Sequence, residues 1–260
     1  MRAPQPAPPG AADSIIEARG LTKEFRGFTA VSDVDLTVRR GSIHALIGPN
    51  GAGKSTVFNL LTRFLPATSG TIRFDGHDIT RSDAADVALR GMVRSFQISS
   101  IFPHLSVHDN VRIALQRPLG LTYQFWRSER CLETLDVRAD ELIGAVGLEG
   151  YRDARACDLS YGRKRALEFA TTLALEPMLM LLDEPMAGLG LEDIERITGL
   201  IRTAAAGRTV LMVEHNLKVV AALSDTVTVL ARGRVLAEGP YPVVAAIPEV
   251  RSAYMGSAHA

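Results

Sequence analysis

The stretch GPNGAGKST at residues 48–56 constrains this chain more than any other feature. It matches the pattern G-x-x-x-x-G-K-[ST], in which the glycines let successive backbone N–H groups point into one concavity. Such a concavity holds a polyphosphate. Lys54 is placed to reach the outer phosphates, and the Ser55 hydroxyl is a suitable oxygen ligand for Mg²⁺.

The flanks of this stretch agree with the pattern, which requires a buried strand before it and a helix after it. Residues 43–47 are apolar and favour a strand. Apolar residues then recur at helical spacing: Val57, Leu60, Leu61, Phe64 and Leu65. A helix N-terminus would therefore face the phosphates and add its dipole. The alternative is a glycine-rich turn with an exposed lysine. At average amino-acid composition, a chance match to the pattern is expected in about 1% of chains this long.

Acidic side chains end a second buried segment. Residues 178–182 are all apolar and are followed by Asp183 and Glu184, as expected of a parallel strand that delivers carboxylates to the ligand-binding edge of a sheet. Asp183 would hold Mg²⁺ through water, and Glu184 would orient or deprotonate the attacking water. Residues 209–213 repeat the pattern close to His215, which can bond a terminal phosphate. Each of these residues also has a simpler interpretation. Carboxylates after a strand can cap a helix or a turn, and a lone histidine at such a position usually has a structural role.

Other segments extend this core. Residues 15–18, 34–38 and 71–74 alternate like strands of an antiparallel patch. Ser106 is expected to cap a helix, and a second helix carries one apolar stripe: Ala139, Leu142, Ile143 and Val146.

Four further residues have two interpretations each. Ser160 and Gly162 precede another helix, as an anion site or simply as an N-cap. Phe25 lies near a turn, where it either stacks on a purine ring or belongs to the core, and the same holds for Phe28.

Composition excludes several classes of protein. Lysine and arginine number 29, as do aspartate and glutamate, so no net field favours nucleic acid as the main partner. The apolar runs are shorter than the roughly 18 residues that span a bilayer, so the chain itself is not expected to cross a membrane. Only Cys131 and Cys157 are present, which excludes a disulfide framework and fits a reducing cytoplasm.

The order of these motifs resembles the ATP-binding subunit of ABC transporters over about residues 14–256. The matching positions follow in order: Phe25, residues 48–56, Gln97, residues 159–162, Asp183 with Glu184, and His215. The resemblance implies an α/β fold of the P-loop NTPase, RecA-like type. That fold has a mainly parallel core sheet, an antiparallel β subdomain and an inserted helical subdomain. It also implies ATP hydrolysis with Mg²⁺.

Site roles carry over by position. Phe25 would stack on adenine, and ATP would contact the loop: Pro49, Asn50, Gly51, Ala52, Gly53, Lys54, Ser55 and Thr56. Ser55, Gln97 and Asp183 would serve Mg²⁺. Lys54, Gln97, Glu184 and His215 would form the catalytic group, in which His215 senses the γ-phosphate and Gln97 links the metal to the membrane subunits. Ser160 and Gly162 would close the site of the other subunit in a head-to-tail dimer.

The resemblance also implies a division of the chain and a set of partners. The expected segments are a disordered tail (1–13), the first part of the nucleotide-binding core (14–97), a helical subdomain (98–160), the second part of the core (161–240) and a C-terminal tail (241–260). The expected partners are a second ATP-binding subunit, membrane permease subunits and, indirectly, a substrate-binding protein. The chain would work at the cytoplasmic face of the inner or plasma membrane.

Several details resemble the subgroup that serves branched-chain amino acid importers. These are Tyr161 within residues 159–162, which form the family's signature motif, residues 186–189, residues 214–216 and the tail at 248–254. Two positions depart from the family pattern: Arg163 replaces a glutamine of most members, and Gly190 replaces an aspartate of many.

Other functions stay open. Urea or amide importers and lipid or lipopolysaccharide exporters use similar ATPases. A soluble P-loop switch ATPase of DNA repair or translation is a different class, but it needs a long coiled-coil insertion or a second cassette. A chain of 260 residues has room for neither. A non-hydrolysing binding module is disfavoured by Lys54, Asp183, Glu184 and His215.

Overall fold

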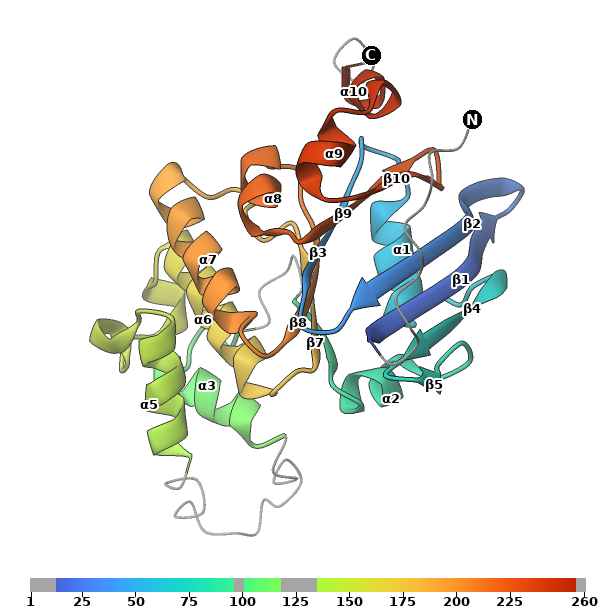
Figure 1. The fold of residues 1–260 in the computed structure, drawn as a ribbon. Coiled ribbons are helices and arrows are strands. Elements are labelled where there is room, and N and C mark those ends of the chain that lie inside the picture. Colours follow the sequence, from blue (N-terminus) through green and yellow to red (C-terminus); the bar gives the residue numbers. More distant parts are fainter. Residues whose placement is uncertain (1–12, 96–100, 118–134, 256–260) are drawn as a thin grey trace.

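A mainly parallel sheet forms the centre of the protein (Figure 1). The computed structural model describes residues 13–95, 101–117 and 135–255. In this part of the chain the sheet has six strands in the order β10-β9-β3-β8-β7-β6. Their bounds are β3 Ile43–Ile47, β6 Met92–Ser95, β7 Leu179–Asp183, β8 Thr209–Val213, β9 Thr226–Ala231 and β10 Arg234–Gly239. Neighbouring strands pair in parallel except β10, which pairs antiparallel with β9.

Both faces of this sheet are buried, as its apolar strands require. Every residue of β3, β7 and β8 is buried. Successive side chains of a strand point to opposite faces, and β7 follows this rule: Leu179 and Leu181 join one core, whereas Met180 and Leu182 join the other. An unbroken apolar run is thus what a strand between two cores needs.

The first core lies between the parallel sheet and an antiparallel sheet. Within the described residues the second sheet has four strands in the order β2-β1-β4-β5. They are β1 Ser14–Phe25, β2 Phe28–Arg39, β4 Ser69–Phe74 and β5 His77–Asp78, with α1 Lys54–Leu61 packed in the same core. The predicted antiparallel patch is confirmed. Its first two strands are longer than expected, because they form one hairpin that turns at residues 26–27.

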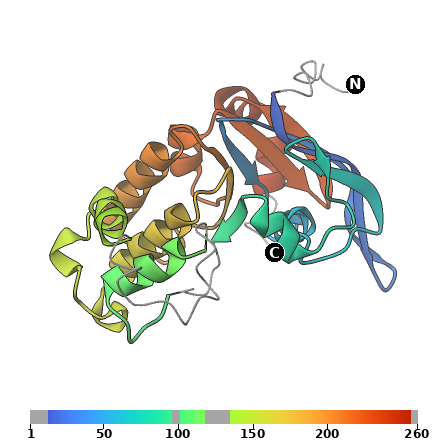
Figure 2. The same cartoon turned by 90° about the horizontal axis from the view of Figure 1, so that it is seen from below.

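Helices cover the opposite face and extend beyond it. The second core joins the sheet to α3 Val107–Leu115, α5 Asp136–Ala145, α6 Tyr161–Ala174, α7 Leu191–Ala204, α8 Leu217–Leu223 and α9 Tyr241–Ala245. Shorter or peripheral elements are α2 Ala84–Leu89, α10 Pro248–Met255 and the 3₁₀ turns η1 Glu149–Tyr151 and η2 Ala156–Asp158. Figure 2 shows α3, α5, α6 and α7 gathered on one side, away from the antiparallel strands.

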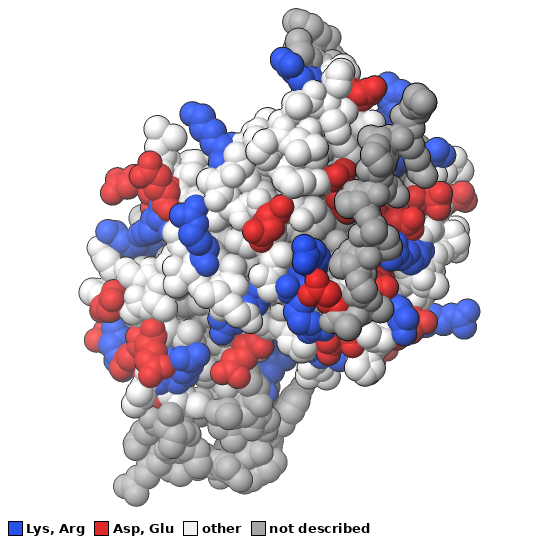
Figure 3. Space-filling view, viewed as in Figure 1, with Lys and Arg blue, Asp and Glu red and all other residues white. Residues whose placement is uncertain are grey.

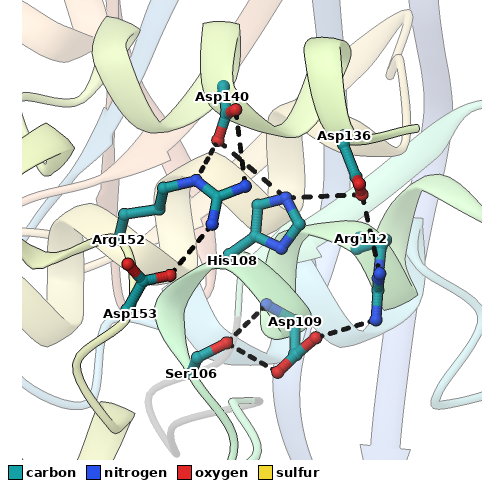
Figure 4. Close-up of polar contacts among 8 residues, drawn as sticks. All are labelled: Ser106, His108, Asp109, Arg112, Asp136, Asp140, Arg152 and Asp153. Atoms are coloured by element: carbon teal, nitrogen blue, oxygen red, sulfur yellow. Dashed lines mark hydrogen bonds and ion pairs between the residues drawn. The ribbon is translucent and has the colours of Figure 1, made fainter. Parts of the chain in front are cut away.

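A charged network connects α3 to α5 (Figure 4). The buried ring of His108 lies with Nε2 3.5 Å from Asp136 Oδ1 and 3.9 Å from Asp140 Oδ1. Arg152 donates to Asp140 at 2.7 Å, and an Arg112 nitrogen lies 3.6 Å from Asp136 Oδ1. These contacts fix the two helices beside each other at the edge of the helical side.

Two predictions about helices have different outcomes. Ser106 caps α3 as predicted, because its hydroxyl oxygen accepts the Asp109 N–H. The extension of α1 to Phe64 and Leu65 is wrong: α1 ends at Leu61, and Arg63 adopts a φ of 62°, which stops the helix. The side chain of Phe64 is consequently 54% exposed.

Side chains of both charges lie on the surface of the protein. Figure 3 shows acidic and basic side chains interspersed over the described part of one face. None of the helices in the described ranges is long and apolar enough to cross a membrane. The predictions for residues 1–12, for Gln97 and for the stretch with Cys131 lie outside the described residues.

Candidate nucleotide site

The glycine-rich loop lies between β3 and α1, at the carboxyl end of the parallel sheet. Gly48 packs so closely on β9 that a Cβ atom would lie 2.2 Å from the Leu230 carbonyl oxygen. Gly53 has a φ of 101°, and a Cβ atom there would approach the Ala30 carbonyl oxygen to 2.8 Å. A side chain at either position would displace the loop. These glycines thus fit a backbone cradle for phosphates.

Lys54 is the buried first residue of α1, and its Nζ atom reaches back over the loop. It donates to the carbonyl oxygens of Gly48 at 2.7 Å and Pro49 at 3.0 Å. Burial lowers the pKa of Lys54, while the negative charges of Glu184 and Asp183 act in the opposite direction. The ammonium group is therefore held between the loop and the two acids.

The acids reach the same edge through strand register. In the parallel ladders Asp183 of β7 lies beside Val213 of β8, and Val213 lies beside Leu46 of β3. Asp183 is buried, and its Oδ1 atom has no hydrogen-bond partner within the described part of the chain. Ser55, next to Lys54, is exposed.

This donor set fits Mg²⁺. A buried carboxylate oxygen and a hydroxyl are hard oxygen ligands, and Mg²⁺ keeps most of its coordination for waters and substrate phosphates. Among the described residues no group of three or more His, Cys, Asp or Glu side chains is arranged to hold a metal ion. The metal would therefore depend on Ser55, Asp183 and the nucleotide together.

Glu184 and His215 form the next pair. Glu184 adopts a φ of 49°, which non-glycine residues seldom do. Its N–H donates to the Val213 carbonyl oxygen at 2.9 Å, and its Oε1 atom lies 2.7 Å from His215 Nε2. Such unusual backbone geometry persists where the surroundings hold it, and it is frequent at functional sites. Glu184 also lies close enough to Lys54 for its negative charge to act on the ammonium group.

Glu214, to which none of the sequence motifs assigns a role, orders this pair. Its buried carboxylate accepts three backbone N–H groups: Met186 at 3.0 Å, His215 at 2.8 Å and Asn216 at 2.9 Å. It thereby ties the loop after β7 to the loop after β8. The sequence motifs did not single out Arg94 either, whose guanidinium donates to Asp183. Glu214 directly follows the predicted buried strand at residues 209–213, which is a sequence signal for it, whereas none of the strands predicted above includes Arg94.

Predicted site residues elsewhere lie apart from this group. Phe25 and Phe28 are 42% and 68% exposed at the tip of the β1–β2 hairpin, so their interpretation as core residues is wrong. Ser160 is the exposed N-cap residue of α6. Among the described contacts, none joins Phe25, Ser160 or Gly162 to Lys54, Asp183, Glu184 or His215. Gln97 lies outside the described residues.

Tyr161, at the start of α6, contacts the loop after Glu184 and, among the described hydrogen bonds, makes none to the phosphate loop. The Tyr161 hydroxyl donates to the Ala187 carbonyl oxygen at 3.2 Å and accepts from Arg165 at 2.8 Å. A Cβ atom on Gly162 would lie 2.2 Å from the Asp193 carboxylate. Position 162 thus has no space for a side chain.

Comparison with known proteins identifies the family. The model of the ABC transporter family matches residues 31–187. The chain belongs to the ABC transporter family. It is the ATP-binding subunit type within that family and therefore an ATPase, which confirms the predicted family, fold class and activity.

Individual relatives are similar over nearly their whole length. The chain is 37% identical to the high-affinity branched-chain amino acid transport ATP-binding protein BraF of Pseudomonas aeruginosa, covering 94% of this chain and 98% of BraF. The ADP conformation of MJ1267, an ATP-binding cassette of an ABC transporter, superposes with a TM-score of 0.80 at 30% identity, covering 94% and 99%. The dimeric structure of the ATP-binding cassette MJ0796, bound to ADP and Pi, superposes with a TM-score of 0.73 at 25% identity. This match covers 87% of this chain and 98% of MJ0796.

Removal of the Glu214 carboxylate tests whether it orders the site. Glu214→Ala leaves three N–H groups without their acceptor, so we expect the free energy of unfolding to fall by at least about 3 kcal/mol, at roughly 1–3 kcal/mol for each unsatisfied buried group. ATP turnover should fall as well, because Glu184 and His215 lose their fixed positions. Urea titration and phosphate release measure the two effects.

Glu195→Ala is the matched control, since Glu195 is an exposed acid on α7. Surface substitutions of this kind usually change stability by less than about 0.5 kcal/mol. If Glu214→Ala behaved like this control in both measurements, Glu214 would have no ordering role.

Proposed function

We propose that this ATPase powers the import of branched-chain amino acids through separate membrane permease subunits, with Mg²⁺ as the metal of the ATP site. The similarity to BraF over nearly the full length of both chains supports the cargo class. The convergence of Lys54, Asp183 and Glu184 at one sheet edge supports the chemistry.

Each residue of the site has a distinct task in this proposal. Lys54 and the loop N–H groups bind the phosphates, and the helix dipole of α1 adds to the attraction. Ser55 and Asp183 hold Mg²⁺, which when bound neutralises charge on the phosphates. Glu184 orients or deprotonates the attacking water, and His215 fixes Glu184 through the 2.7 Å contact. Gln97 is assigned to the metal and to the link with the permease, and the exposed Phe25 to stacking on adenine.

Glu184→Gln separates binding from hydrolysis. The amide cannot accept a proton from water, so we expect turnover to fall by at least roughly 10²-fold, the scale for loss of a positioned base. ATP affinity should stay unchanged, because Lys54 and the loop are intact. Calorimetry and phosphate release measure the two quantities.

Glu195→Gln, on the exposed face of α7, should keep normal turnover. Turnover of Glu184→Gln close to that of the wild type would show that another group activates the water.

The start of α6 is proposed to complete the ATP site of a second subunit. Ser160 is exposed, and its side chain makes no capping hydrogen bond to α6, which leaves the hydroxyl and the helix N-terminus available for an anion. The dimeric relative with ADP and Pi supports a paired arrangement. The same arrangement explains why Ser160 and Gly162 make no described contact with Lys54 in one chain.

Ser160→Arg should block the dimer without affecting nucleotide binding by the monomer. The bulky cation cannot fit at a tight anion site between subunits, so ATP-dependent dimerisation and hydrolysis should both be lost. ATP affinity of the isolated monomer should equal that of the wild type. Size-exclusion chromatography with ATP and calorimetry measure these properties.

Ser252→Arg, a matched change at an exposed position of α10, should behave like the wild type. A large loss of monomer affinity in Ser160→Arg would place Ser160 in the site of its own chain and overturn the composite site.

A cavity beside the helical side is proposed as the contact surface for a permease subunit. It has a volume of about 300 Å³ and lies among α2, β6, α3 and α6. Its rim carries exposed aromatic side chains, Phe64 at 54% and Phe102 at 51%. Exposed apolar surface around a cavity is typical of an interaction site, and the ATP-binding protein of a transporter must contact the part that carries the cargo.

Uptake measurements test the cargo. Deletion of the gene should abolish high-affinity uptake of labelled leucine, isoleucine and valine, and the wild-type gene should restore it. Lys54→Ala is the control for ATP dependence and should not restore uptake, because the phosphates lose their cation. Normal uptake of these amino acids together with loss of urea or amide uptake would contradict the proposed cargo.

A further inference from the structure

A buried arginine contacts the proposed metal carboxylate. Arg94 lies on β6, next to β7 in the sheet. Its Nη1 atom donates to Asn59 Oδ1 on α1, and its Nη2 atom donates to Asp183 Oδ2, both at 2.5 Å. The side chains of Arg94 and Asp183 are only 14% and 4% exposed.

This contact balances a charge that would otherwise be costly. A buried carboxylate without a counter-ion is strongly unfavourable, and deletion of one partner of such a pair typically destabilises a protein. Arg94 is the only side chain that donates to Asp183 among the described hydrogen bonds. Lys54 also lies close enough to interact with Asp183, but its Nζ atom donates to the loop carbonyls. Arg94 is thus the direct partner of the carboxylate.

The pairing uses only half of the carboxylate. Oδ2 accepts from Arg94, whereas Oδ1 has no described partner. Asn59 holds the second arm of the guanidinium, and the ring of Phe58 lies 5.8 Å from its central carbon. The arginine is therefore fixed from three sides and cannot swing away without the loss of these contacts.

We propose that Arg94 is an internal counter-ion of the metal site, which neutralises Asp183 in the metal-free protein and lowers the affinity of the site for Mg²⁺. This inference rests on the proposed assignment of Mg²⁺ to Asp183. A fixed positive charge repels a divalent cation at the same carboxylate, and at an effective dielectric of about 20 the repulsion over a few ångströms corresponds to at least roughly a tenfold change in affinity. Arg94 is accordingly a positioning residue and not a catalytic one. A moderate affinity lets the metal leave with the product.

The test measures Mn²⁺, a spectroscopic substitute for Mg²⁺, on the ADP complex. In Arg94→Met, which removes the charge but keeps a long apolar chain, electron paramagnetic resonance should show Mn²⁺ binding at least roughly tenfold tighter than in the wild type. The unfolding temperature of the metal-free protein should fall, because Asp183 loses its partner. Mn²⁺ should then raise this temperature more in Arg94→Met than in the wild type.

Two variants separate charge from structure. Arg94→Lys keeps the positive charge, so its Mn²⁺ affinity should stay near that of the wild type. In the Asp183→Asn background, Arg94→Met should no longer tighten Mn²⁺ binding. The effect of residue 94 on the metal depends on its contact with the Asp183 carboxylate, so the two substitutions are not additive. If Arg94→Met does not fold, Arg94→Gln serves for the same comparison.

Mn²⁺ affinity that is unchanged or weaker in a folded Arg94→Met protein would overturn the counter-ion role. The outcome for the metal site itself is distinct: if Asp183→Asn alone kept full Mn²⁺ affinity, the assignment of the metal to Asp183 would fail.

Discussion

The register of three parallel strands is the constraint on which the rest of the structure depends. β3, β8 and β7 pair so that Leu46, Val213 and Asp183 lie side by side at their carboxyl ends. The phosphate loop follows the first strand, His215 the second and Glu184 the third. A shift of one residue in any ladder would turn every side chain of that strand to the opposite core, so the two cores that surround the sheet also fix the geometry of the site.

Local sequence patterns predicted those features of the fold that depend on residues adjacent in the chain. The glycine-rich loop, the buried strand before Asp183 and the serine that caps α3 were all foreseeable, because each follows from a short run of residue types. The end of α1 was not, because its apolar spacing continues to Leu65 while Arg63 adopts a left-handed conformation. The sequence also left open whether Phe25 and Phe28 are exposed. A phenylalanine occurs both at the tip of a hairpin and in a core strand, so the residue type alone does not distinguish the two places.

Contacts between distant segments could not be predicted from the sequence. Arg94 and Asp183 are 89 residues apart, and Met186 and Glu214 are 28 apart. No local pattern shows which buried charges meet, because the partner depends on strand order and on which face each side chain takes. The useful signal is weaker: a charge within or directly after a strand of the central sheet needs a partner where it is shielded from water, and both Arg94 and Glu214 meet that description.

Arg94 also relates the ATP site to the helical side of the protein. Residue Arg94 lines the cavity among α2, β6, α3 and α6, and its side chain donates to Asp183. A segment that fills this cavity would therefore lie against the residue whose guanidinium donates to Asp183. Because Asn59 on α1 holds the other arm of Arg94, displacement of this one residue would affect the carboxylate and the helix behind the phosphate loop together. Arg94 is thus the residue through which the lining of the cavity meets the acidic side of the ATP site.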